Sequence, residues 1–280
     1  MGKDIDGKRM ADRIRKELKR KVSLINPKPC LAVIQAGNNP ASEVYVRIKQ
    51  KACEETGIIS KKYSLPGSTS EKDLVKIIRK LNTDRAVNGI LVQLPLPVHI
   101  SEKNVLSAIA PEKDVDCFHP INVGRLAIGE ETFAPCTPAG IIALIESVTR
   151  IEGRHTVIVG RSNIVGKPLA LLLLQKNATV TVCHSKTKSI SDHTRKADIL
   201  VSAVGRPGLI TRDMVKKGAV VIDVGTTKIR EKIMGDVDYI SVKKVASHIT
   251  PVPGGVGPMT VATLIQNTLK AALLQKKQKK

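Results

Sequence analysis

Aromatic side chains are scarce in this chain: they make up 2% of its 280 residues, and tryptophan is absent. The scarcity removes the stacking platforms on which proteins hold single-stranded nucleic acid. The formal net charge of +21 points toward a nucleic-acid partner, but the basic residues are spread over predicted amphipathic helices. We therefore expect no nucleic acid as a partner. We interpret the charge as a solubility feature, with attraction of an acidic small ligand as the secondary interpretation.

Cysteine pairs and long apolar runs are also missing. Five cysteines are scattered along the chain without a C-x-x-C pair, which suggests neither a disulfide framework nor a zinc site, so we expect no bound metal. The first residues have no apolar signal core, and the longest apolar runs are too short to span a bilayer. These absences predict a soluble cytoplasmic protein that has reduced thiols and does not bind membranes.

What the sequence does contain is a regular alternation of helix and strand patterns, over a length that suits two domains. In the first half we expect strands at 30–37 and 89–97, and helices at 40–57 and, after a capping box at Ser70 and Asp73, at 74–81. In the second half we expect strands at 156–160, 178–183, 197–204 and 219–225, with helices at 168–175 and 213–217. This order predicts an α/β fold with mainly parallel sheets, whose second half is a Rossmann-like unit.

Two further helices, at 137–148 and 258–275, flank that unit. We expect them to bridge the two domains, with the last helix returning to pack on the first domain. The basic end of the chain, QKKQKK, is interpreted as a solvated, frayed end.

The stretch HTVIVGRSNIVGKP, residues 155–168, has the pattern of a buried strand, a glycine turn and a helix. Gly160 lets the backbone approach a diphosphate, and the N-terminus of the following helix favours negative charge. Ser162 replaces the second glycine of G-x-G-x-x-G, while Gly166 and Pro168 fit the pattern loosely. An ordinary tight β–α turn is the alternative, but the surrounding strands favour a dinucleotide site.

The choice of dinucleotide depends on the end of the next strand. Sites for NAD carry an acidic residue there, which holds the ribose hydroxyls. Here the strand ends in His184, Ser185, Lys186 and Thr187, with no carboxylate. With Arg161 as a second positive charge, this end favours NADP; a polar surface loop is the alternative.

Three candidate residues for proton chemistry lie in the first half. Tyr45 and Lys49 are four residues apart and therefore share a helix face. A lysine beside a phenol in a partly desolvated cleft can transfer protons near neutrality, although a snorkelling lysine packed on tyrosine is the simpler explanation. Gln93 is the polar residue of an otherwise apolar predicted strand and can orient a lysine; a glutamine bonded to local backbone is the alternative.

Two further segments suggest ligand contacts. Asp114 and Asp116 fall in a loop after a short helix, where a carboxylate can hold an amidine-like edge bidentately, although acidic loops are usually only solvated. The segment ITPVPGGVGPMT is too rich in proline and glycine for a surface linker, and we interpret it as a rigid turn that brings backbone against a ligand.

Assembled, these segments resemble the bifunctional methylenetetrahydrofolate dehydrogenase/cyclohydrolase family. The blocks that carry the resemblance stand in the family's order and spacing over essentially the whole chain. They are YVRIKQKACEETGI, GILVQLPLP, KDVDCFHPINVGRL, PCTPAGI, IVGRSNIVGKP, CHSKT, GAVVIDVG, GDVDY and ITPVPGGVGPMT.

The resemblance implies a three-layer α/β catalytic domain over 1–137, joined by a C-terminal helix over 258–280, and a Rossmann-like NADP-binding domain over 138–257. It also implies a folate cleft between the domains, a homodimer and no metal. The implied reaction is oxidation of 5,10-methylenetetrahydrofolate with NADP, followed in the same cleft by hydrolysis of the methenyl product to 10-formyltetrahydrofolate.

Site residues follow from the matching blocks. The resemblance makes Lys49 the central proton-transfer residue, positioned by Gln93, with Tyr45 stacking on the folate. It assigns the amino-pyrimidine edge of the pterin to Asp116. The turn that would close on the substrate comprises Pro253, Gly254 and Gly255. The residues that would bind NADP are Gly160, Arg161, Ser162 and Ser185, with Thr226 near the nicotinamide.

Two departures from the family pattern bear on this site. The family commonly has KDVDG where this chain has Cys117, and DVGIN where this chain has DVGTT. We predict that Cys117 keeps a positive φ, held by the packing of the residues that follow it. A monofunctional dehydrogenase of the same family, and a Rossmann dehydrogenase acting on another small substrate, stay as alternatives.

Overall fold

A computed structural model describes residues 1–130, 133–230 and 232–277. The chain divides into two compact units. Unit 1 comprises Met1–Ala11 and Thr137–Thr260, and unit 2 comprises Asp12–Cys136 and Val261–Lys280. The chain passes between the units within helix α1 (Gly7–Ser23), at the start of helix α6 (Cys136–Glu146) and within helix α10 (Val256–Lys277). Each unit has its own sheet and is described separately.

The centre of unit 2 is a parallel sheet of three strands, in the order β3-β2-β4. The strands are β2 (Cys30–Ala36), β3 (Ile59–Leu65) and β4 (Gly89–Val92). All seven residues of β2 are buried, because it is the central strand and both of its faces are covered. Alternate side chains of β2 enter two different hydrophobic clusters, with Leu31 and Val33 in one and Ala32 and Ile34 in the other.

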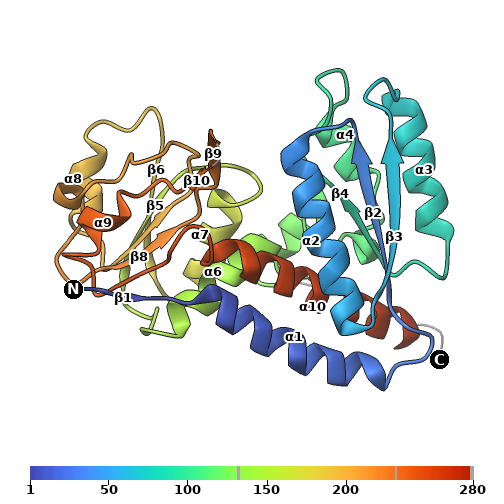
Figure 1. Cartoon of the computed structure of the whole chain (residues 1–280), viewed down its shortest axis with the longest axis horizontal. Helices are drawn as coiled ribbons and strands as arrows, with labels where there is room; N and C mark the ends of the chain where they lie inside the picture. Colours follow the sequence, from blue (N-terminus) through green and yellow to red (C-terminus); the bar gives the residue numbers. More distant parts are fainter. Residues whose placement is uncertain (131–132, 231, 278–280) are drawn as a thin grey trace. The chain divides into compact units, whose positions relative to one another are not determined.

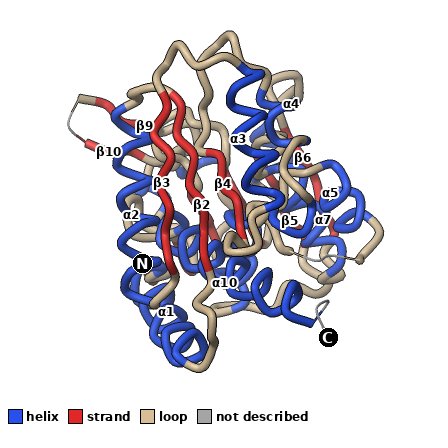
Figure 2. The backbone as a smooth tube through the Cα atoms, turned by 90° about the vertical axis from the view of Figure 1, so that its right-hand side faces the viewer, coloured by secondary structure: helices blue, strands red, loops and turns tan. Residues whose placement is uncertain are grey.

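Helices cover both faces of this sheet. The remaining helices of unit 2 are α2 (Pro40–Thr56), α3 (Glu71–Thr83), α4 (Glu102–Ser107), the 3₁₀ turn η1 (Pro111–Lys113) and α5 (Pro120–Ala127). Figures 1 and 2 show α2 and α3 on opposite sides of the sheet. Ser70 caps α3 by accepting a hydrogen bond from the Asp73 N–H, as the sequence predicts. The expected three layers are therefore confirmed.

The C-terminal helix completes the core of unit 2. Val261, Leu264, Ile265 and Leu269 of α10 are buried in the same cluster as Leu31 of the sheet. The return of this helix to the first sheet is thus confirmed, although it begins two residues before the expected position. The expectation for the basic tail reaches past residue 277, into positions outside the described residues.

Unit 1 contains a parallel sheet of six strands, in the order β1-β11-β8-β7-β5-β6. The strands are β1 (Lys3–Asp4), β5 (His155–Val159), β6 (Thr179–Cys183), β7 (Ile199–Ser202), β8 (Val220–Asp223) and β11 (His248–Ile249). Its other elements are α7 (Gly166–Gln175), α8 (Ile190–Thr194), η2 (Arg212–Met214), α9 (Tyr239–Val242) and the hairpin β9 (Thr227–Ile229) and β10 (Lys232–Met234). The order of β6, β5 and β7 reverses direction between β5 and β7, which marks the usual ligand edge of such sheets.

The structure corrects several expected elements. The strand expected at 89–97 ends at Val92, because the following LPLP segment cannot continue a sheet ladder. The helix expected at 213–217 is only a 3₁₀ turn over Arg212–Met214. Five residues before a glycine form too few hydrogen bonds to offset the free-energy cost of helix nucleation. The sheet of unit 1 also gains β1 and β11, because Lys3 and Asp4 pair with His248 and Ile249.

That pairing places Met1–Ala11 in unit 1, whereas the sequence predicted that the first domain begins at residue 1. Among the described helices, none is long and apolar enough to cross a membrane.

Candidate functional site

In unit 2, a lysine and a glutamine from distant parts of the chain meet. Lys49 Nζ on α2 donates a 2.9 Å hydrogen bond to Oε1 of Gln93, the first residue after β4. The Gln93 amide nitrogen donates to the Leu94 carbonyl at 2.7 Å, which fixes which end of the amide faces the lysine. Tyr45 lies one turn before Lys49 on the same helix, and all three side chains are half-buried. The structure therefore brings together the three residues predicted for proton chemistry.

The two aspartates of the following loop have different environments. Asp114 is buried and accepts hydrogen bonds from the Phe118 and His119 N–H groups, at 3.2 and 2.8 Å, and from Asn122 Nδ2 at 2.9 Å. Burial raises the pKa of Asp114, while these donors oppose the rise. The hydrogen bonds of Asp114 are thus made within its own loop. The half-buried Asp116 is the better candidate for binding a ligand through its carboxylate.

Between Asp116 and Phe118, the backbone of Cys117 has φ +63°. This left-handed conformation favours glycine and costs about 1 kcal/mol or more for other residues. The predicted positive φ at Cys117 is therefore confirmed. The bonds from Phe118 and His119 to Asp114 hold the backbone immediately after it, and the Cys117 side chain is buried in the core of unit 2.

Cys136, at the start of α6, lies near both Asp116 and Lys49. Complete burial raises the pKa of the Cys136 thiol well above the usual range. The Asp116 carboxylate raises this pKa further, whereas the positive charge of Lys49 lowers it. Asp116 and Lys49 are therefore both near enough to the Cys136 thiol to change its pKa. Sequence reasoning counted Cys136 only as a reduced cysteine, because nothing in its spacing marks it as a neighbour of Asp116.

In unit 1, the predicted cofactor residues follow the carboxyl ends of parallel strands. Gly160 comes directly after β5, with φ +129°. A Cβ atom on Gly160 would lie 2.3 Å from the Ala203 carbonyl oxygen, and one on Gly166 would lie 2.2 Å from the Gly160 oxygen. Both glycines are therefore required by close backbone approach, at the edge where α/β sheets bind dinucleotides.

Ser162 stands where the G-x-G-x-x-G pattern has its second glycine, and its hydroxyl bonds the turn that follows. Ser162 Oγ accepts from the N–H groups of Val165 and Gly166, at 3.2 and 3.4 Å, at the N-terminus of α7. Arg161 and Ser185 are exposed, one after β5 and the other after β6. The turn around Ser185 is closed by a 2.9 Å bond from the His184 N–H to Thr187 Oγ1.

Thr226 is exposed after β8, beside a pair of buried carboxylates that sequence reasoning missed. Asp223 accepts from the N–H groups of Gly225, Asp236 and Val237, at 2.8 to 3.0 Å. Burial raises the Asp223 pKa to about 6, against the effect of these donors. Asp236 in turn accepts from the Val204 and Arg206 N–H groups, both at 2.8 Å. The two aspartates thus hold the loops that follow β7 and β8, and the aspartates of the motifs DVG and GDVDY are the signal that marks them.

The proline–glycine turn after β11 packs against the start of α1. The Lys8 N–H donates to the Gly254 carbonyl at 2.9 Å. A Cβ on Gly7 would lie 1.9 Å from the Gly255 oxygen, so Gly7 permits this approach. Gly254 has φ +112°, and Pro253 is exposed. The turn is therefore anchored, with its proline facing solvent.

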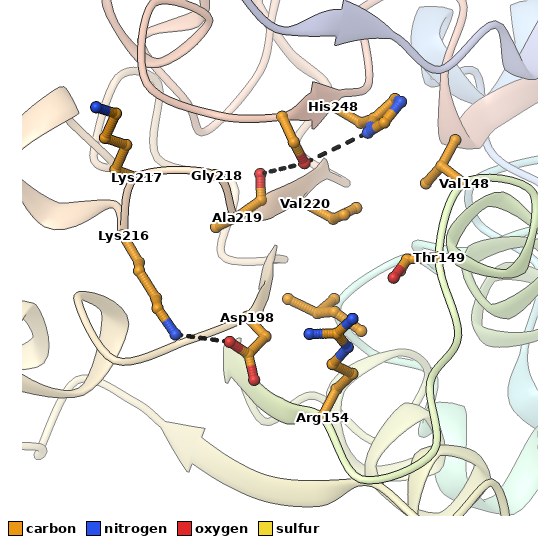
Figure 3. Close-up of a pocket in the computed structure, with 12 residues that line it drawn as sticks. Val148, Thr149, Arg154, Asp198, Lys216, Lys217, Gly218, Ala219, Val220 and His248 are labelled. Atoms are coloured by element: carbon orange, nitrogen blue, oxygen red, sulfur yellow. Dashed lines mark hydrogen bonds and ion pairs between the residues drawn. The ribbon is translucent and has the colours of Figure 1, made fainter.

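Figure 3 shows a cavity of about 170 Å³ in unit 1. Its lining includes Arg154, Asp198 and Ala219, each directly before a strand, and Lys216 Nζ lies 2.7 Å from Asp198 Oδ1. The cavity lies where the parallel strands begin, whereas Gly160, Ser185 and Thr226 follow their ends, so it is not the dinucleotide site. Within the described part of the chain, no group of three or more His, Cys, Asp or Glu side chains is placed to hold a metal.

Two family models match this chain. The catalytic-domain model of tetrahydrofolate dehydrogenase/cyclohydrolase matches residues 5–116, and the NAD(P)-binding-domain model of the same family matches residues 135–276. The chain belongs to the tetrahydrofolate dehydrogenase/cyclohydrolase family. The family and the two-part α/β fold inferred from the sequence are therefore confirmed.

Similar proteins agree over the full length. The bifunctional protein FolD of Halalkalibacterium halodurans is 56% identical over 96% of this chain and 98% of its own. The FolD dehydrogenase/cyclohydrolase structure from Campylobacter jejuni superposes with a TM-score of 0.96 at 49% identity, covering 98% of this chain and 99% of its own. A Trypanosoma brucei FolD structure complexed with NADP and an inhibitor has a TM-score of 0.94 at 41% identity, covering 100% and 99%.

Proposed function

We propose that this protein oxidises 5,10-methylenetetrahydrofolate with NADP and hydrolyses the resulting 5,10-methenyltetrahydrofolate to 10-formyltetrahydrofolate. The observation that carries the proposal is the Lys49–Gln93 hydrogen bond of 2.9 Å in a chain that matches both models of the family. A dehydrogenase for an unrelated small substrate is not favoured, because the catalytic-domain match covers residues 5–116.

In unit 2, Lys49 acts in the hydrolytic step. Water adds to the methenyl carbon, the bond between that carbon and N5 breaks, and one proton is released. Lys49 accepts a proton from the attacking water, and Gln93 holds the lysine nitrogen in place. Asp116 accepts hydrogen bonds from the amino-pyrimidine edge of the pterin, and Tyr45 stacks on the folate.

In unit 1, the residues fit a dinucleotide phosphate. Gly160 and Gly166 leave the backbone open where side chains would block it, and Ser162 lies at the N-terminus of α7, a position that favours anions. In this proposal Arg161 and Ser185 contact the ribose phosphate, and Thr226 lies near the nicotinamide. NADP held by these residues would supply the oxidant, as the acceptor of a hydride from the methylene carbon. The turn from Pro253 to Gly255 closes on the substrate.

The proposal extends to assembly and location. A homodimer is supported by strand β6, which among the described strands pairs with β5 alone and so leaves one edge of the sheet open. Val182 on this strand is 37% exposed. A cytoplasmic location is supported by five buried free cysteines. Sedimentation of the purified protein at several concentrations tests the dimer, which a single monomeric species would contradict.

Replacement of Lys49 by methionine tests the proposed chemistry. We expect Lys49→Met to lose at least about 100-fold in hydrolysis of methenyltetrahydrofolate, in line with the usual contribution of general acid–base catalysis, while folate still binds. The matched control is Lys51→Met, because Lys51 is an exposed lysine of the same helix. Methenyltetrahydrofolate decay and NADPH formation are followed by absorbance. Hydrolysis at the parent rate in Lys49→Met would assign the base to another residue.

A further inference from the structure

The buried polar side chain of Asn267 lies on α10, 5% exposed. Its Nδ2 donates to the carbonyls of Val115 and Ala134, both at 2.8 Å, and contacts Cys136 Sγ at 3.6 Å. One amide group thereby ties α10 to two separate segments of unit 2. The first of these carbonyls belongs to the peptide group that links Val115 to Asp116.

The same peptide group is held from a second side. Cys136 Sγ donates to the Val115 carbonyl at 3.3 Å, and the Asp116 carboxylate lies close enough to this thiol to raise its pKa. On the other side of Asp116, Cys117 has its positive φ, and Asp114 accepts from the next two N–H groups. The backbone is therefore fixed immediately before and after Asp116.

We propose that Asn267 is a positioning residue for Asp116, and through it a determinant of folate affinity. This inference rests on the proposed function, in which Asp116 holds the pterin edge. A bidentate carboxylate contact depends on alignment, and a displacement of about 1 Å can remove much of such an interaction. Loss of the Asn267 amide leaves the Val115 carbonyl with the weaker hydrogen bond from the Cys136 thiol. The Val115–Asp116 peptide group can then rotate and turn the carboxylate away from its ligand.

The same helix offers a matched control. Gln275 Nε2 donates to the carbonyls of Asn88 and Glu112, at 2.9 and 3.1 Å, and Gln275 Oε1 accepts from Asn88 Nδ2 at 3.0 Å. Gln275 therefore makes as many bonds from α10 to unit 2 as Asn267 does, but none to the peptide groups next to Asp116. The two residues separate positioning of Asp116 from general stabilisation of the unit.

The experiment measures kcat and KM for methylenetetrahydrofolate and NADP in the full chain. We expect Asn267→Leu to raise the KM for folate about tenfold, the consequence of losing the amide hydrogen bonds to two carbonyls, with kcat and the KM for NADP within about twofold of the parent values. Gln275→Leu should lower the thermal midpoint at least as much and leave the folate KM within about twofold. An equal rise of folate KM in both variants would overturn the inference.

A double-mutant cycle separates this inference from the proposed function. If Asp116 binds the pterin, Asp116→Ala alone raises the folate KM strongly, and adding Asn267→Leu then changes it less than about twofold, because the two substitutions act on one contact. An unchanged KM in Asp116→Ala would refute the proposed role of Asp116. A raised KM in Asp116→Ala with equal, additive effects of Asn267→Leu would refute the positioning role alone.

If Asn267→Leu does not fold, Cys136→Ala decides the question. This substitution removes the thiol that donates to the Val115 carbonyl, and alanine is compatible with the helix. We expect a rise of folate KM of about threefold, consistent with one weak hydrogen bond. No change in folate KM for Cys136→Ala would overturn the inference.

Discussion

At the scale of single residues, two arginines stand at opposite ends of β5. Arg154 precedes the strand and Arg161 follows the glycine at its end, and both are exposed. Their charges are equal, but they lie at opposite edges of the sheet. Because only the carboxyl edge binds dinucleotides in such sheets, the pair separates a specific contact with the ribose phosphate from the general effect of a basic surface.

We predict that Arg161→Ala weakens NADP binding roughly 10- to 150-fold and NAD binding much less, because a charge-assisted hydrogen bond contributes about 1.5 to 3 kcal/mol. Arg154→Ala should leave the ratio of the two affinities unchanged. Titration of both cofactors against both variants, by calorimetry, gives the four constants. Equal losses of NADP and NAD affinity in Arg161→Ala would remove this arginine from the phosphate site.

Cys117 provides a second prediction at this scale. Its φ of +63° is a value that glycine adopts without strain, so Cys117→Gly should leave the loop geometry intact. We therefore expect a nearly unchanged KM for folate in Cys117→Gly, whereas Asp116→Ala raises it strongly. Steady-state kinetics of the two variants check this. A large gain in folate affinity from the glycine would show that the cysteine distorts the loop.

Some residues of the candidate site were predictable from the sequence, and others were not. Lys49 and Gln93 were predicted because helical spacing and one polar residue in an apolar stretch are local signals, and their hydrogen bond is present. Asn267 gave no such signal, because its partners Val115 and Ala134 are more than 130 positions away and are reached through backbone carbonyls. Backbone acceptors carry no side-chain pattern, so contacts of this kind are visible only in a structure.

At the scale of elements, the turn from β5 to α7 shows how tightly strand and helix are joined. The Gly160 N–H donates to the Cys183 carbonyl at 2.8 Å, and its Cα faces the Ala203 carbonyl. The turn therefore contacts the ends of both neighbouring strands, β6 and β7. A side chain added at Gly160 would therefore collide with the backbone at Ala203, and the bond to Cys183 prevents the turn from moving away.

We predict that Gly160→Ala lowers NADP affinity at least about tenfold and also destabilises unit 1, because its Cβ would lie 2.3 Å from a backbone oxygen. Gly153→Ala is the matched control: Gly153 also has a positive φ, of +70°, but its Cβ would meet nothing within 4 Å. It should show the conformational cost alone, about 1 kcal/mol, with NADP affinity unchanged. Urea unfolding and NADP titration of both variants separate the two effects.

The elements themselves were largely predictable where an apolar run was bounded by glycine or proline, as for β2 and β5. The short strands β1 and β11 were not, because two residues carry no periodicity and Lys3–Asp4 is charged. Their strand conformation comes from pairing with each other and with β8.

At the scale of the whole molecule, unit 2 is discontinuous in sequence. Its core needs Val261, Leu264, Ile265 and Leu269 from the end of the chain, all at most 4% exposed. Burying one such side chain contributes about 1.5 to 3 kcal/mol, so four of them match much of the net stability of an ordinary domain.

We predict that a chain ending at Thr260 keeps unit 1 and loses the folded structure of unit 2. It should still bind NADP, while the part of the cooperative urea transition that belongs to unit 2 disappears. Addition of a peptide comprising residues 261–277 should restore that transition, measured by circular dichroism. Cooperative unfolding of both units without the peptide would show that α10 is dispensable for unit 2.

The pairing of β1 with β11 has a consequence for the order of folding during synthesis. Lys3 and Asp4 leave the ribosome long before their partners His248 and Ile249, which come much later in the chain. Nascent chains generally fold domain by domain from the N-terminus, yet the sheet of unit 1 cannot close at β1 until His248 and Ile249 have been made. Until then Lys3 and Asp4 lack their partner strand β11. Their charges are an advantage during this time, because charged edge residues resist pairing with other chains.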